Sequence, residues 1–131
     1  MFTLRDKQFE GGSLNYEEAR ALAKSWCEAW STGDLDAVMG HYADDVKFSS
    51  PTVIKRLGIV DGWIEGKTRL REHFAVGIKT PGLRFEFVDV LLGVGGMCIL
   101  YKRETGAVVV DVIELDANGK GKVVQAFYGE P

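Results

Sequence analysis

The hydrophobic period of this chain is mainly helical before Lys79 and alternating after Leu83, with one short alternating segment at residues 46–50. Apolar stripes predict helices over residues 16–32, 34–42 and 67–79, and alternation predicts strands over 46–50, 83–92, 97–103, 107–115 and 122–128. Helices followed by hairpin-linked strands indicate an α+β domain, with helices gathered on one face of an antiparallel sheet. We therefore expect a single domain over residues 1–131, in which an antiparallel sheet curves around a helix.

Local signals predict where the first helices begin and end. Asn15 followed by Glu18 is typical of a capping box at a helix start. Gly33 is expected to end that helix, and Asp34 to cap the next one. Two helices therefore abut at Gly33.

Two segments do not follow either period. Residues 51–66 contain three glycines among many apolar residues, and we interpret them as a long loop that could act as a lid over a pocket. Residues 1–12 carry four charges and no apolar run, which predicts an N-terminal arm rather than a secretion signal. We expect the protein to be cytoplasmic.

Composition narrows the partners and cofactors. The net charge of −3 offers no positive field for nucleic acid, and the longest uncharged stretch, residues 90–101, is too short to cross a membrane. Cys27 and Cys98 lie in apolar surroundings and are expected to be reduced thiols. With only two histidines in the chain, no histidine-rich metal site is expected, and no cofactor is predicted.

Strand alternation predicts which side chains face the helices. A sheet curved around a helix leaves a hollow, and a single bulge would reverse the assignment beyond it. The expected inward residues are Phe85, Phe87, Ile99, Tyr101, Val109, Asp111, Ile113, Val124 and Ala126.

Several short segments, in this order and spacing, resemble the nuclear transport factor 2 like superfamily, and its SnoaL-like and ketosteroid-isomerase-like branch in particular. They are residues 22–36, 41–46, 48–51, 66–72 and 118–124, within a likeness that covers about residues 16–128. The resemblance implies a cystatin-like α+β barrel, in which a cone-shaped curved antiparallel sheet wraps around three N-terminal helices. It also implies a pocket between the sheet and the helices, and a homodimer formed through the outer face of the sheet.

The chain departs from the catalytic patterns of that branch. The ketosteroid isomerase positions for base, tyrosine and second acid correspond to Ser50, Trp26 and Ile113, so isomerisation of that type is not expected. Arg103 and Asp111 match part of the epoxide hydrolase pattern, but residues 124–128 lack its further acid. The chain also fails to match the polyketide cyclase pattern, because its residues 124–128 contain no aspartate.

Two residues are candidates for proton transfer. Asp111 interrupts an apolar strand, and burial would raise the pKa of its carboxyl; alternatively a bulge turns it to solvent, or Arg103 or Lys102 pairs with it. His73 corresponds to a pocket-mouth aromatic of the resembled family and could carry a proton, or could simply pack.

Two functional hypotheses remain open. The first is a pocket for a small hydrophobic or aromatic molecule, with metal-free isomerase, cyclase or hydrolase-type proton transfer. The second is a non-catalytic dimerisation or protein-interaction module whose hollow is filled by its own side chains. The residues expected to contact a ligand are Trp26, Phe48, Ser50, Trp63, Phe87 and Tyr101.

Overall fold

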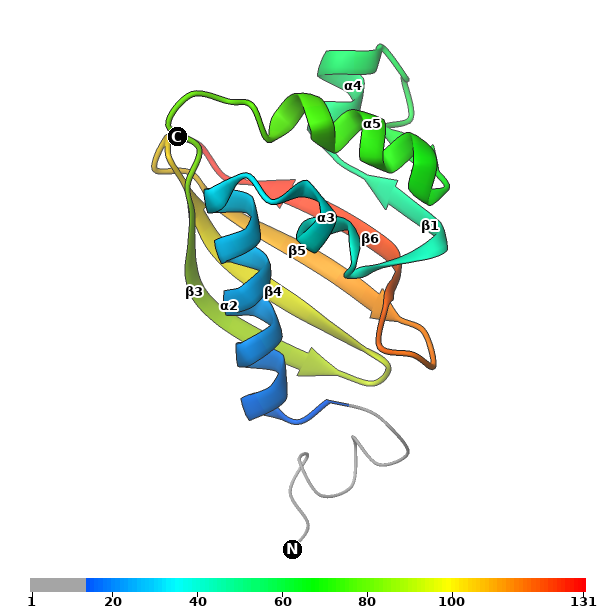
Figure 1. Cartoon of the computed structure of the whole chain (residues 1–131), viewed down its shortest axis with the longest axis vertical. Coiled ribbons are helices and arrows are strands. Elements are labelled where there is room, and N and C mark those ends of the chain that lie inside the picture. Colours follow the sequence, from blue (N-terminus) through cyan, green and yellow to red (C-terminus); the bar gives the residue numbers. More distant parts are fainter. Residues whose placement is uncertain (1–13) are drawn as a thin grey trace, which may run out of the picture.

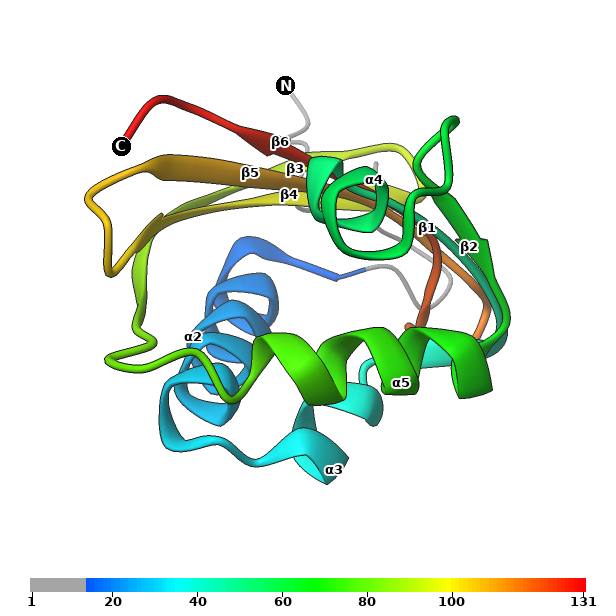
Figure 2. The same ribbon diagram turned by 90° about the horizontal axis from the view of Figure 1, so that it is seen from above.

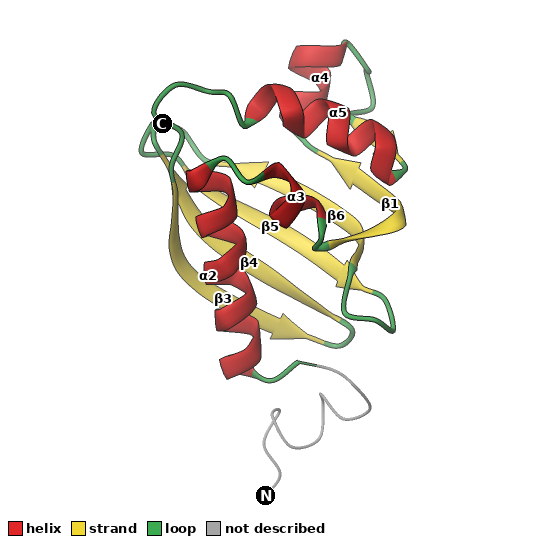
Figure 3. Cartoon of the chain, viewed as in Figure 1, coloured by secondary structure: helices red, strands yellow, loops and turns green. Residues whose placement is uncertain are grey.

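The structure, a computed structural model, describes residues 14–131 and combines helices with one curved sheet (Figures 1 and 3). The predicted N-terminal arm, residues 1–12, lies outside the described residues. No helix within 14–131 is long and apolar enough to cross a bilayer. In chain order the elements are α2 (Tyr16–Thr32), α3 (Leu35–Met39), β1 (Tyr42–Ser49), α4 (Pro51–Leu57), β2 (Trp63–Glu65), α5 (Lys67–Gly77), β3 (Phe85–Gly93), β4 (Gly96–Arg103), β5 (Val108–Leu115) and β6 (Gly121–Tyr128).

The sheet has the strand order β2-β1-β6-β5-β4-β3, and α2, α3 and α5 lie along its concave side (Figure 2). The predicted α+β class and curved sheet are confirmed. Two details differ from the prediction. The pairing of β1 with β6 is parallel, which the long connection between these two strands allows. The sheet is also open rather than closed into a barrel, with β2 and β3 at its edges among the described strands.

The first helices begin and end where the sequence predicts. The Asn15 side chain accepts a hydrogen bond from the Glu18 amide, and the Glu18 carboxylate accepts one from the Asn15 amide. Gly33 ends α2 in the left-handed conformation, with φ of 76°. Asp34 then caps α3 by accepting a hydrogen bond from the Ala37 amide.

The prediction of a continuous loop over residues 51–66 is wrong. Ser50 caps a short helix, α4, that has Pro51 at its first position, and Gly58 ends it in the left-handed conformation. Val53 anchors this helix in the core, and the chain then returns as the short edge strand β2. Seven helical residues are too few to show a clear hydrophobic period, so this helix could not be recognised from the sequence pattern. The lid role of this segment stays a prediction.

The predicted inward face of β4 and β5 is correct. Ile99, Tyr101, Val109 and Asp111 are all buried under the helices. A bulge in β3 after Phe87 shifts the alternation there, so that Val90 becomes the next buried residue of this strand. The curvature of the sheet and the bulk of α2 therefore bring the middle of β5 to the floor of the hollow.

Candidate functional site

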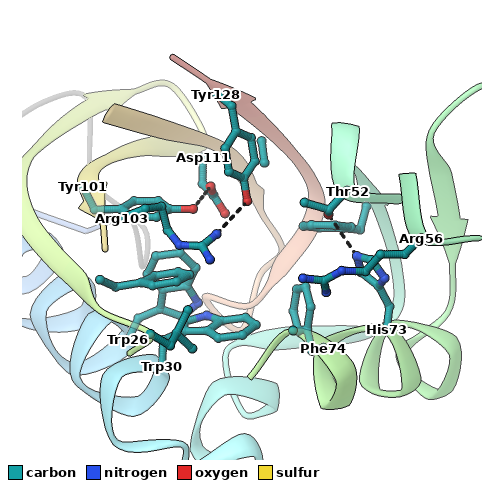
Figure 4. A pocket seen from close by; sticks show the side chains of 15 residues that line it. Trp26, Trp30, Thr52, Arg56, His73, Phe74, Tyr101, Arg103, Asp111 and Tyr128 are labelled. Atoms are coloured by element: carbon teal, nitrogen blue, oxygen red, sulfur yellow. Dashed lines mark hydrogen bonds between the residues drawn. The ribbon is translucent and has the colours of Figure 1, made fainter. Parts of the chain in front are cut away.

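A small cavity lies where the concave face of the sheet meets α2, α4 and α5 (Figure 4). Its volume is about 40 Å³, enough for about three water molecules at roughly 10–15 Å³ of this measure each. One part of its wall is aromatic, and the rest is polar or charged. The aromatic residues are Trp26, Trp30, Phe48, Phe74, Phe85, Tyr101 and Tyr128, and the charged or polar ones are Thr52, Arg56, His73, Arg103 and Asp111.

Asp111 supplies a carboxyl group to this cavity from the centre of β5. It is 3% exposed, and its Oδ1 accepts a hydrogen bond of 2.9 Å from Tyr101 Oη. Burial raises the pKa of Asp111 from 3.8 to about 7, although the Tyr101 hydrogen bond and the charge of Arg103 act in the opposite direction. Near neutral pH this carboxyl can therefore both release and accept a proton.

Tyr101 remains a phenol under these conditions. Burial, together with the neighbouring Asp111, raises the pKa of Tyr101 well above its usual range. Its hydroxyl is thus a fixed proton donor in the hydrogen bond to Asp111. Tyr101 also stacks on Phe85, with 4.6 Å between ring centroids, which holds the phenol in place.

Arg103 and Tyr128 form the rim beside Asp111. Both guanidinium edges of Arg103 are occupied: Nε and Nη2 donate to the Glu104 carboxylate at 2.9 and 3.0 Å, and Nη1 donates to Tyr128 Oη at 3.2 Å. The charge of Arg103 is therefore balanced by Glu104 within the protein.

The opposite wall contains a hydrogen-bonded chain from α4 to α5. Thr52 Oγ1 lies 3.0 Å from His73 Nε2 and 2.8 Å from Ser50 Oγ. Burial, and to a smaller extent the positive charge of Arg56, lowers the pKa of His73 from 6.5 to about 4. At neutral pH His73 is therefore an uncharged imidazole, suited to hydrogen bonding rather than to carrying a positive charge.

Two buried polar atoms of the cavity wall have no hydrogen-bond partner in the described protein, namely Trp30 Nε1 and His73 Nδ1. Buried polar groups in folded proteins are almost always hydrogen-bonded, because an unmet donor or acceptor costs about 1–3 kcal/mol. Both residues line the same cavity. Polar atoms of a bound molecule or of water would remove this cost.

Five of the eight residues predicted from the sequence come together here, namely Trp26, Phe48, His73, Tyr101 and Asp111. The hydrogen-bonding atom of Trp26 is already engaged, since its Nε1 donates to Tyr42 Oη at 3.1 Å. Trp26 therefore contributes its ring to the cavity rather than its N–H group.

The other three predicted residues lie outside this cavity. Ser50 is buried, but its hydroxyl caps α4. Trp63 lies in the edge strand β2, opposite Ser49. Phe87 lies under the ammonium group of Lys24 from α2, 5.5 Å from its ring centroid, just before the bulge in β3.

Sequence reasoning missed four polar residues of the site or gave them no role. Tyr128 continues the inward alternation of Val124 and Ala126, so the period of β6 could have identified it. Thr52 and Arg56 are four residues apart on α4 and share one face of it, a relation hidden by the interpretation of this segment as a loop. Trp30 lies on the apolar stripe of α2, a position typical of a core residue, and its unpartnered N–H group is visible only in the structure.

Comparison with known proteins agrees with this architecture. A family model described as a SnoaL-like domain matches residues 23–127. A SnoaL-like protein of unknown function from Burkholderia thailandensis has a similar structure, with a TM-score of 0.81 and 28% identity over 86% of this chain and 94% of the other. No curated protein matches the sequence significantly.

More distant solved structures share the fold alone. An NTF-2 like protein of unknown function from Burkholderia xenovorans has a TM-score of 0.67 and 20% identity, over 98% of this chain and 88% of the other. A candidate ketosteroid isomerase from Kribbella flavida has a TM-score of 0.67 and 18% identity, over 88% of this chain and 81% of the other. The predicted kinship with the NTF2-like superfamily and its SnoaL-like branch is confirmed.

Proposed function

Because the chain belongs to the SnoaL-like domain family and carries a buried acid at the floor of its cavity, we propose that it binds a small planar organic molecule and transfers a proton on it through Asp111. The reaction would need no metal and would be of the isomerase, cyclase or hydrolase type. Its common step is the movement of a proton between the Asp111 carboxyl and a carbon or oxygen of the ligand.

One observation carries this proposal: the pKa of Asp111, raised to about 7, in a carboxyl that faces a cavity. Only Oδ1 accepts a hydrogen bond from the described residues, and Oδ2 is left for a ligand. A general acid or base works best when its pKa is close to the ambient pH. No described cation forms an ion pair with Asp111, because Arg103, whose charge acts on it, is paired with Glu104.

The aromatic wall supports a planar ligand. Trp26, Trp30 and Phe74 meet edge to face, with centroid separations of 6.4 Å for the tryptophan pair and 4.8 Å between Trp30 and Phe74. The cavity in its present shape is far below the roughly 300–1,000 Å³ of drug-sized ligand sites. A one- or two-ring molecule would therefore enter only with some displacement of these side chains.

Proton exchange on a planar ketone tests the proposal. In D₂O near neutral pH, the protein is expected to accelerate exchange of the α-protons of 2-indanone, followed by NMR. Asp111→Asn should lower the protein-catalysed rate by about 100-fold or more. Glu114→Gln, an exposed acid on the same strand, should leave the rate unchanged. Equal rates for the Asn variant and the native protein would refute the role of Asp111.

We also propose that two copies associate through the outer face of the sheet. This face carries exposed apolar side chains in neighbouring rows of adjacent strands, and contiguous exposed apolar surface is typical of interaction sites. The residues are Leu91, Val108, Val112 and Phe127. The cavity opens on the other face of the sheet, so association would leave Asp111 accessible from the helical side.

A further inference from the structure

We propose that the ligand is a planar organic monocarboxylate, whose carboxylate binds the guanidinium of Arg56. This inference rests on the proposed function and specifies its ligand.

Arg56 is an exposed residue at the mouth of this cavity, and its guanidinium has no carboxylate partner among the described residues. Arg103 is held by both oxygens of Glu104, and His73 is uncharged at neutral pH. No ion pair or hydrogen bond links Arg56 to another described residue, although it lines the cavity. One uncompensated positive charge beside an aromatic pocket matches a ligand with one negative charge, and the planar guanidinium fork matches a carboxylate.

A glycine in α5 makes room for this guanidinium. Gly77 is buried in the last turn of α5, with an ordinary negative φ that does not require glycine. A Cβ atom at this position would lie 2.6 Å from Arg56 Nη1. Glycine in a helix costs about 1 kcal/mol relative to alanine, so its presence here is unfavourable for α5 itself. What the glycine provides is space for Arg56 to lie against α5 at the cavity.

The positions of the charged residues around the cavity set the orientation of the ligand. Figure 4 shows Asp111, Tyr101 and Arg103 on one side of the cavity and Arg56, Thr52 and His73 on the other. A carboxylate at Arg56 would keep the anionic end of the ligand away from Asp111, where a second negative charge would be unfavourable. Trp30 and His73, each with one ring nitrogen that has no partner among the described residues, also line the cavity.

Benzoate and its uncharged analogue benzamide test the inference by NMR titration. The reporter is the indole N–H signal of Trp30, assigned with the Trp30→Phe variant. We expect the native protein to bind benzoate at least tenfold more tightly than benzamide. Arg56→Gln should lower benzoate affinity about tenfold and leave benzamide affinity unchanged.

Two further variants separate local binding from general effects. Lys55→Gln removes the same charge from the neighbouring position of α4, which does not line the cavity, and should leave benzoate binding unchanged. Gly77→Ala should displace the guanidinium of Arg56 and weaken benzoate binding, while the melting temperature stays equal or rises. A structural role of Gly77 alone would not alter the preference for benzoate over benzamide.

The outcomes distinguish the two proposals. Equal affinity for benzoate and benzamide, or equal losses in the Lys55 and Arg56 variants, would overturn the carboxylate inference and leave proton transfer by Asp111 standing. Absence of any Trp30 shift with both compounds, together with no exchange on 2-indanone, would overturn the proposed function and this inference with it.

Discussion

Tyr101 Oη donates a hydrogen bond of 2.9 Å to Asp111 Oδ1, and both residues are almost fully buried. The two lie on adjacent strands as diagonal neighbours, since Tyr101 pairs with Val109 and Asp111 with Ile99. This contact keeps a carboxyl group in place beneath the helices without neutralising it. The pKa of Asp111 remains raised because one phenol replaces only part of the hydration that the carboxylate loses.

The raised pKa of Asp111 predicts a specific pH dependence of stability. Between pH 3.8 and about 7 the folded protein holds a proton that the unfolded chain has released. The contribution of Asp111 to the free energy of unfolding therefore falls as pH rises through this window, by about 4 kcal/mol at most, and is constant above it. The lowered pKa of His73 acts in the opposite direction between about pH 4 and 6.5, so the contribution of Asp111 is measured as the difference between the native protein and Asp111→Asn. In urea unfolding across the pH range, the Asn variant should gain stability relative to the native protein as pH rises through the window. A difference that does not change with pH would show that Asp111 makes no such contribution.

Loss of the Tyr101 hydroxyl should extend to higher pH the range over which Asp111 lowers stability. Tyr101→Phe removes a hydrogen bond that lowers the pKa of Asp111, so this pKa should rise further and the decline in stability should extend to higher pH. Below pH 4, where Asp111 is protonated in both states, the variant should lose about 1 kcal/mol. The same unfolding series measures both effects. An unchanged window would mean that the hydrogen bond contributes nothing to the titration.

If two copies associate through the outer face of the sheet, a charge introduced on this face should produce a monomer. Val112→Glu introduces a charge at an exposed position of β5 without touching the cavity. Light scattering after size exclusion should give a dimer mass for the native protein and about 14.5 kDa for the variant, with unchanged circular dichroism. A native protein that elutes with the monomer mass at all concentrations would contradict the dimer.

A glycine at the start of β4 should be intolerant of any side chain. A Cβ on Gly96 would collide with the backbone carbonyl of Ile113 on β5, which cannot move without breaking the strand pairing. We expect Gly96→Ala to cost about 2–4 kcal/mol of unfolding free energy. Gly93→Ala, in the same hairpin but with open space around it, should cost less than about 1 kcal/mol. Equal losses in a urea titration would argue against the close approach.

Local and periodic features were predictable from the sequence, whereas long-range ones were not. The cap at Asn15, the end of α2 at Gly33 and the inward position of Asp111 follow from neighbouring residues or from strand alternation. The parallel pairing of β1 with β6 depends on a contact between residues about 75 positions apart, which no local pattern encodes.

The polar wall of the cavity could not be predicted from the sequence either. Arg56 reaches the cavity because α4 is a helix and because Gly77 of α5 lies beside it, and each fact depends on tertiary packing. The size of the cavity is equally hidden, since it depends on how the rings of Trp26, Trp30 and Phe85 orient against one another. The type of each residue could be read from the sequence, but which residues share a wall could not.

The titration of the Asp111 carboxyl tests the central claim most directly. Carboxyl ¹³C NMR on protein labelled at aspartate, with the Asp111 signal assigned by its loss in the Asn variant, follows this one group across the pH range. The account predicts a midpoint near pH 7, where the group can both give and take a proton. A midpoint near its ordinary 3.8 would mean a carboxylate that is permanently charged at neutral pH, and would contradict proton transfer by Asp111.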